Sequence, residues 1–113
     1  MIEQISPADL SSWFSSAAPD GLAVVLDVRE PWEWETASVQ AEGFTLVKIA
    51  MNEIPARLAE LAPAQPIACL CHHGARSQRV AHFLAQNGFE QVVNIAGGID
   101  AWSQIRDPSV PRY

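Results

Sequence analysis

The feature that most constrains the fold is a polar turn that lies between an apolar run and a segment with helical spacing. The apolar run covers residues 66–70, the turn reads Cys-His-His-Gly-Ala-Arg-Ser from Cys71 to Ser77, and a helix is predicted from about Ser77 to Asn87. A strand that leads directly into a helix is typical of parallel α/β sheets. In these sheets ligands bind beyond the carboxyl ends of the strands, which is where Cys71 would lie.

The residue types of this turn suit an anion better than a hydrophobic core. A helix N-terminus offers unpaired backbone N–H groups and the positive end of the helix dipole, and both would stabilise a thiolate on Cys71. Gly74 allows backbone angles that other residues avoid, and Ala75 leaves the turn uncrowded. Arg76 carries forked donors for sulfate-like or phosphate-like oxygens. Because a cation opposes the dipole at this end of a helix, we interpret Arg76 as an anion ligand.

The charge distribution favours the same interpretation. Thirteen acidic residues outnumber seven Lys and Arg residues, and the net charge is −6. Two of these seven cations, Arg76 and Arg79, and two of the three histidines, His72 and His73, lie in this one segment. A negatively charged molecule repels nucleic acid and anionic membranes, so neither is expected as a partner. The local positive charge is predicted to serve a small anion.

Length and composition predict one globular domain over residues 1–113, in which residues 107–113 form an extended tail. The chain of 113 residues is 49% hydrophobic and 18% charged, which is ordinary for a globular protein. The first residues do not resemble a secretory signal, and no apolar run has the length of a membrane span, so we expect a cytoplasmic protein. Cys69 and Cys71 are separated by one residue, a poor spacing for a disulfide, so both thiols are expected to be reduced.

Apolar patterning predicts an α/β fold along the whole chain. Continuous apolar runs indicate buried strands, and apolar residues three and four positions apart indicate helices with one buried face. The predicted strands cover residues 2–5, 22–26, 44–49, 66–70 and 91–95. The predicted helices cover residues 10–17, 52–61 and 77–87, with a short helical turn at Trp32 and Trp34 and a short helix that carries Ile99 and Trp102. This alternation favours a largely parallel sheet with helices on both faces.

Three segments together resemble a single-domain rhodanese. They are the turn at residues 71–77, the stretch Leu-Asp-Val-Arg-Glu at 26–30, and the stretch Asn-Ile-Ala-Gly-Gly-Ile-Asp-Ala-Trp at 94–102. The resemblance implies a rhodanese-like α/β fold with a five-stranded, mostly parallel sheet and helices on both faces. It also implies a thiosulfate sulfurtransferase. Residues 41–45 read Ala-Glu-Gly-Phe-Thr, where the family usually has a His-Ile-Pro-Gly-Ala type of run.

The resemblance also implies a role for each residue of the turn. Cys71 would accept a sulfane sulfur from thiosulfate or a persulfide donor and pass it to cyanide or a thiol acceptor, which is covalent catalysis in two half-reactions. The backbone N–H groups of residues 72–76 would surround the persulfide, and Arg76 would hold the oxyanion of the donor. Substrate binding is therefore predicted for His72, His73, Gly74, Ala75, Arg76 and Ser77.

Other residues near the turn are expected to be structural. Asp27 and Arg29 are predicted to form an ion pair near the site, and Cys69 is predicted to be a small buried packing residue. No cofactor and no metal are predicted, because four ligands crowded into five positions cannot easily surround one tetrahedral ion. Those four ligands would be Cys69, Cys71, His72 and His73.

Two other functions use the same residue types. A persulfide carrier or interaction module would exchange sulfur with a partner protein and turn over small donors only weakly. A cysteine phosphatase or arsenate reductase also places a thiolate in an anion cradle that ends in Arg. Four residues separate Cys71 from Arg76 here, whereas the phosphatases that resemble rhodaneses have five, so phosphatase activity is not expected.

Overall fold

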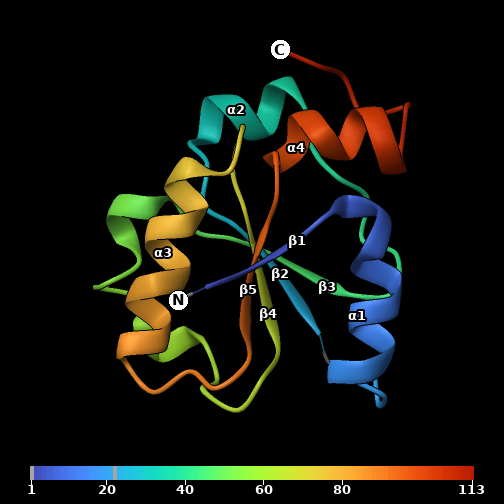
Figure 1. Ribbon diagram of the computed structural model, residues 1–113. Helices are drawn as coiled ribbons and strands as arrows, with labels where there is room; N and C mark the ends of the chain where they lie inside the picture. Colours follow the sequence, from blue (N-terminus) through green and yellow to red (C-terminus); the bar gives the residue numbers. More distant parts are fainter. Residues whose placement is uncertain (1, 22) are drawn as a thin grey trace.

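The computed structural model describes residues 2–21 and 23–113, and within them five strands form one sheet in which all neighbouring strands are parallel. The strands are β1 (Glu3–Ile5), β2 (Val24–Asp27), β3 (Thr45–Lys48), β4 (Ile67–Leu70) and β5 (Val92–Ile95). Their order is β1-β5-β4-β2-β3, so β4 is the central strand (Figure 1). The predicted parallel sheet is confirmed, although Leu22, the first residue of one predicted strand, lies outside the described residues.

Helices cover both faces of this sheet, as the alternating pattern predicted. They are α1 (Leu10–Ala17), α2 (Pro31–Thr36), α3 (Ala75–Gln86) and α4 (Gly98–Ala101), and α4 continues as a π-helical turn at Trp102–Arg106. Figure 1 shows α3 on one face, α1 and α4 on the other, and α2 above the carboxyl ends of the strands. In the described part of the chain, no helix has the length and apolar character needed to cross a membrane.

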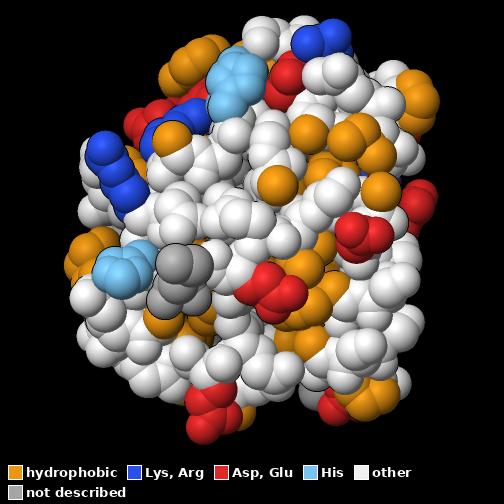
Figure 2. Space-filling view, in the orientation of Figure 1, with side chains coloured by type: hydrophobic (Ala, Val, Ile, Leu, Met, Phe, Trp, Pro, Cys, Tyr) orange, Lys and Arg blue, Asp and Glu red, His pale blue; other side chains and the backbone are white. Residues whose placement is uncertain are grey.

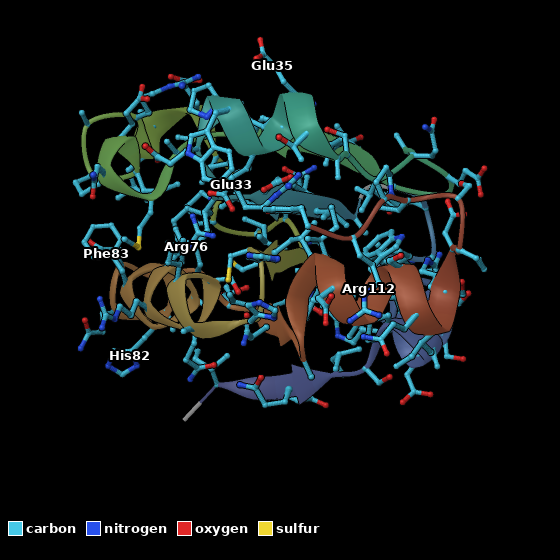
Figure 3. All side chains as sticks on the ribbon, turned by 90° about the horizontal axis from the view of Figure 1, so that it is seen from above. Glu33, Glu35, Arg76, His82, Phe83 and Arg112 are labelled. Atoms are coloured by element: carbon cyan, nitrogen blue, oxygen red, sulfur yellow. The ribbon has the colours of Figure 1, made fainter. Side chains whose placement is uncertain are left out.

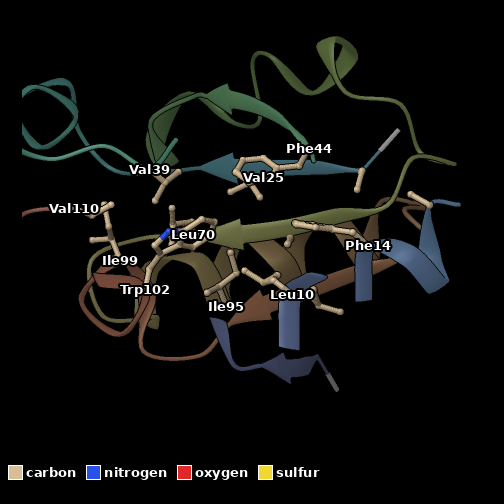
Figure 4. Packing of buried hydrophobic residues seen from close by; sticks show 14 of the residues in the cluster. Leu10, Phe14, Val25, Val39, Phe44, Leu70, Ile95, Ile99, Trp102 and Val110 are labelled. Atoms are coloured by element: carbon tan, nitrogen blue, oxygen red, sulfur yellow. The ribbon is translucent and has the colours of Figure 1, made fainter. Parts of the chain in front are cut away.

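The central strand separates two hydrophobic clusters because its side chains alternate between the faces. Ala68 and Leu70 pack with Leu10 of α1 and with Trp102 (Figure 4). Ile67 and Cys69 pack in the other cluster, which includes residues of α3. Cys69 is fully buried there, which confirms the prediction that it is a packing residue.

The helix predicted over residues 52–61 is wrong. The structure has two short 3-10 turns instead, Met51–Glu53 and Leu58–Glu60, held by bonds between residues three positions apart. Pro55 lies between them and has no backbone N–H, so it cannot donate to the carbonyl oxygen of Met51, which accepts a bond from Ile54 instead. The predicted inward-facing residues are right in part, because Ile54 and Leu61 are buried.

Residues 41–45, which depart from the usual family run, build part of the hydrophobic core. Phe44 is buried, and its ring centroid lies 5.4 Å from that of Phe14 and 5.8 Å from that of Trp102. Gly43 precedes it with a positive φ of 80°, which allows the chain to turn into β3. The different sequence therefore still anchors this edge of the sheet.

The predicted tail at residues 107–113 has no helix or strand, but it packs against the rest of the molecule. Val110 is buried, and its carbonyl oxygen accepts a hydrogen bond of 2.5 Å from the Ser103 hydroxyl. Beyond this anchor the chain passes over the end of the molecule where the carboxyl ends of the strands lie (Figure 1). Residues 111–113 are thereby brought to the turn that contains Cys71.

Candidate active site

Cys71 lies directly after the central strand β4 and begins the active-site loop, which we define as residues 71–77. Its side chain is almost completely buried, with 1% of the residue exposed. The backbone N–H of Gly74 donates a hydrogen bond of 3.1 Å to Cys71 Sγ, and Ser77 Oγ lies 3.3 Å from the same sulfur. Gly74 has a φ of 112°, which turns its N–H toward the sulfur before α3 begins at Ala75. The helix thus begins two residues earlier than predicted.

Asn94 of β5 forms hydrogen bonds with two residues of the loop. Its side-chain amide donates to the carbonyl oxygen of Gly74 at 3.1 Å, and its Oδ1 lies 2.5 Å from Ser77 Oγ. Ser77 is fully buried, so its single hydroxyl proton is shared among Asn94 Oδ1, Cys71 Sγ and Gly74 O. This hydroxyl is therefore a donor that can turn to the sulfur when negative charge develops there.

The start of α4 fixes the other side of the loop. The N–H groups of Ile99 and Asp100 donate to the carbonyl oxygens of Cys71 and His72, at 2.8 and 3.2 Å. Gly98 packs against these same two carbonyl groups so closely that a Cβ atom would clash with both oxygens. Both carbonyl oxygens are thus engaged by α4.

We expect Gly98→Ala to destabilise the protein by about 2–4 kcal/mol, because it combines left-handed strain with a clash against the loop. Gly43→Ala is the matched control, since Gly43 also has a positive φ but has open space where a Cβ would lie. Its expected cost is about 1–2 kcal/mol, from strain alone. Urea unfolding of both variants measures the difference. Equal losses would show that close packing at Gly98 contributes nothing.

The structure provides Arg76 with a partner that the sequence did not reveal. Both terminal nitrogens of its guanidinium donate to the carboxylate of Glu33 in α2, at 2.6 and 2.8 Å (Figure 3). This pair explains why a cation lies in the first turn of α3, where it opposes the dipole. The predicted contact between Arg76 and the donor's oxyanion must therefore compete with an internal carboxylate.

Glu33 is a buried carboxylate with four hydrogen bonds. Besides the two from Arg76, it accepts one from the hydroxyl of Tyr113 at 2.7 Å and one from the backbone N–H of Glu30 at 3.0 Å. Burial opposes its charge, but the hydrogen bonds from Arg76 and Tyr113 outweigh this and lower the pKa of Glu33 to about 2. The same contact raises the pKa of Arg76 above its usual value. Both groups are therefore charged at neutral pH.

Asp27 and Arg29 form an ion pair at the end of β2, with an Arg29 Nη2 to Asp27 Oδ2 distance of 2.7 Å. Both side chains are fully buried. The remaining guanidinium donors reach the carbonyl oxygens of Glu33 and Ala37 and the hydroxyl of Tyr113. Arg29 therefore ties the C-terminal half of α2 to the end of β2, which suits the structural role predicted from the sequence.

His72 and His73 stack on each other, and Tyr113 stacks on His72. The centroid distance is 3.9 Å in both pairs, and the Tyr113 and His72 rings are almost parallel, at 6°. Nε2 of His72 donates to the carbonyl oxygen of Tyr113 at 2.8 Å. His73 and Ala75 are exposed, so they line the outer rim of the loop.

The family model of the rhodanese-like domain matches residues 6–105 of this chain. The chain belongs to the rhodanese-like domain family. A crystal structure of a rhodanese-related protein from Thermoplasma volcanium shares this fold, with a TM-score of 0.76 and 30% sequence identity. That match covers 98% of this chain and 99% of the other.

Two of the curated relatives of this rhodanese-like domain have names that refer to sulfur chemistry. The adenylyltransferase and sulfurtransferase MOCS3-2 of Zea mays is 32% identical over 88% of this chain and 22% of its own length. The putative sulfur carrier protein YrkF of Bacillus subtilis is 34% identical over 70% of this chain and 40% of its own length. The chain spans less than half the length of these relatives.

Three residues of the rhodanese-like site were not predicted from the sequence, namely Glu33, Asn94 and Tyr113. Asn94 carried a signal, because it is a polar residue inside an otherwise apolar strand. The sequence signal for Glu33 was weaker. Glu30 and Glu33 have the spacing of a capping box, and the structure shows that capping box at the start of α2. Among the described residues, no group of three or more His, Cys, Asp or Glu side chains is arranged to hold a metal ion.

Proposed function

We propose that this rhodanese-like domain is a sulfurtransferase in which Cys71 carries a sulfane sulfur as a persulfide. The observation that supports this most is the position of Cys71 Sγ, which accepts the Gly74 N–H inside the loop at the start of α3. The first turn of a helix leaves further N–H groups without intrahelical acceptors. These groups stabilise negative charge on a thiolate or on the outer sulfur of a persulfide.

The proposed reaction has two displacements. The Cys71 thiolate attacks the outer sulfur of thiosulfate, the S–S bond of thiosulfate breaks, and sulfite leaves with the electron pair. Cyanide or a thiolate acceptor then attacks the terminal sulfur of the persulfide. The bond between that sulfur and Cys71 Sγ breaks, which restores the thiolate and releases thiocyanate or a new persulfide.

The charges around the loop give thiosulfate no advantage over a persulfide donor, because the nearby arginines are paired with carboxylates. The guanidinium groups of Arg29 and Arg76 are each paired with a carboxylate, from Asp27 and Glu33 respectively. Thiosulfate carries two negative charges, and a persulfide carries one. The loop N–H groups and the Ser77 hydroxyl are then the main ligands of the transferred sulfur, with His73 and Ala75 at the rim.

The sulfurtransferase and sulfur carrier names of the relatives support this class of function. Under the proposal the domain works in a reducing compartment such as the cytoplasm, because both cysteines are free thiols. Its partners are a small sulfur donor and a thiol or cyanide acceptor, or a protein that exchanges a persulfide with Cys71.

Intact-protein mass spectrometry tests the proposal. The reduced protein is incubated separately with thiosulfate and with glutathione persulfide, and a gain of about 32 Da, one sulfur atom, is expected on Cys71. Cyanide should remove the added mass and yield thiocyanate. No gain with either donor would contradict the proposal. Loading by a donor without transfer to small acceptors would favour the persulfide carrier instead.

A further inference from the structure

Tyr113 contacts one end of the active-site loop directly and the other end through Glu33, although it lies 36 positions after Ser77 in the sequence. At one end its ring stacks on His72, the residue that follows the nucleophile, with ring centroids 3.9 Å apart. At the other end its hydroxyl donates to Glu33 Oε2 at 2.7 Å, and that oxygen accepts Arg76 Nη2 at 2.8 Å. Tyr113 therefore links the start of the loop, through its ring, to Arg76 near the end of the loop, through its hydroxyl and Glu33.

The position of Tyr113 is set by directed bonds as well as by packing. Arg29 Nη1 donates to its hydroxyl oxygen at 3.0 Å, and the hydroxyl proton goes to Glu33. Burial raises the pKa of Tyr113 to about 12, so this proton is present at neutral pH. The carbonyl oxygen of Tyr113 also accepts a bond from His72. One residue therefore joins α2, the end of β2 and the loop.

Residues 110–112, which precede Tyr113, contact the rest of the molecule mainly through two side chains. Val110 is buried, and beyond it Arg112 forms an ion pair with Asp100 in which the Arg112 side chain is 59% exposed. Exposed ion pairs of this kind contribute little to stability. A movement of Tyr113 away from the loop would leave the buried side chain of Val110 in place.

Cys71 must meet its substrates, yet only 1% of the residue is exposed while Tyr113 bridges the loop. We infer that Tyr113 is a specificity-determining residue that limits the size of the group able to reach Cys71. A single sulfur atom on a small donor passes, whereas a bulky donor or a protein acceptor requires Tyr113 to move away. The role of this size limit in sulfur transfer rests on the proposed function. The size limit on reagents that reach Cys71 does not depend on that function.

Alkylation of Cys71 by two reagents of different size tests the inference. Second-order rates are measured for iodoacetamide and for a bulky N-aryl maleimide on the parent, Tyr113→Ala and Tyr113→Phe. Tyr113→Ala should speed the maleimide on the order of tenfold, the ratio expected from loss of one aromatic contact and its hydrogen bonds. The iodoacetamide rate should change much less. Tyr113→Phe keeps the ring but loses the hydroxyl, so its maleimide rate should lie between that of the parent and that of Tyr113→Ala.

Ile105→Ala serves as the control, because it also removes a large side chain, but one that is exposed and belongs to no part of the loop, so both rates should stay unchanged. An unchanged maleimide rate in Tyr113→Ala would overturn the inference. An equal increase for both reagents would also overturn it, because that result means a loosened loop and not a size limit. Alkylation needs no sulfur transfer, so a failure of the mass experiment would leave this result standing.

Discussion

Cys71→Ser is expected to take up no sulfur and to lose turnover by a factor of about 10³ or more, the size of loss seen when an enzyme's nucleophile is removed. A serine hydroxyl remains protonated at neutral pH and is a weak nucleophile toward sulfur, so the first displacement does not occur. The side chain has a similar size and can still accept the Gly74 N–H, so the fold should remain intact. Initial rates with thiosulfate and with a persulfide donor, together with intact mass, measure the effect.

Cys69→Ala is the matched control for this prediction. Cys69 lies two residues earlier on β4 and is fully buried, and burial raises the pKa of its thiol far above neutral. It is therefore an inert packing group, and its replacement should keep turnover while stability falls by about 1 kcal/mol. Loss of turnover in a folded Cys69→Ala protein would show that both thiols take part. Normal sulfur loading of Cys71→Ser would remove Cys71 from the mechanism.

Glu33→Gln should give the second large effect, a loss of about 3 kcal/mol in the free energy of unfolding together with reduced turnover. The amide replaces one acceptor oxygen with a donor and removes the charge that Arg76 faces. Arg76 and Tyr113 then lack their shared partner, and the end of the active-site loop loses the pair that positions it. Urea unfolding and steady-state rates measure the two consequences separately.

Glu60→Gln offers a control with the same chemistry in a different environment. Glu60 also accepts two hydrogen bonds from one arginine, Arg57, but both side chains are well exposed. Water replaces lost bonds at such a site, so little measurable change in stability is expected. If Glu33→Gln were equally harmless, the buried pair would have no role in holding the loop.

The Glu33 contribution also has a defined pH dependence. Its pKa falls from an ordinary 4.5 to about 2 on folding, so the folded state binds fewer protons in this range. Stability from this group is complete above about pH 4.5 and is lost as the pH falls toward 2. The stability difference between the parent and Glu33→Gln should therefore shrink over this window and stay constant above it. A difference that does not vary with pH would contradict the assigned pKa.

The sequence allowed accurate prediction where local pattern and burial agree. Strands such as β2 and β4 are continuous apolar runs because both of their faces are covered, and this composition is readable without coordinates. The start of α3 was readable to within two residues, because a glycine and a thiol that precede a helical pattern indicate a turn at a helix N-terminus. Residues 52–61 were misread, because the spacing of apolar residues indicates which side chains are buried and does not show which backbone hydrogen bonds form.

What the sequence by itself determined is therefore the parallel sheet, the loop at its central strand and the position of Cys71. Only the tertiary structure decided what surrounds that loop. Glu33 and Arg76 lie 43 positions apart, and Tyr113 lies still farther from Glu33, so no local spacing links them. They meet because α2 and residues 111–113 both end above the carboxyl edge of the sheet. Contacts between segments distant in sequence depend on chain topology, and in this protein they place Glu33, Arg76 and Tyr113 around the active-site loop.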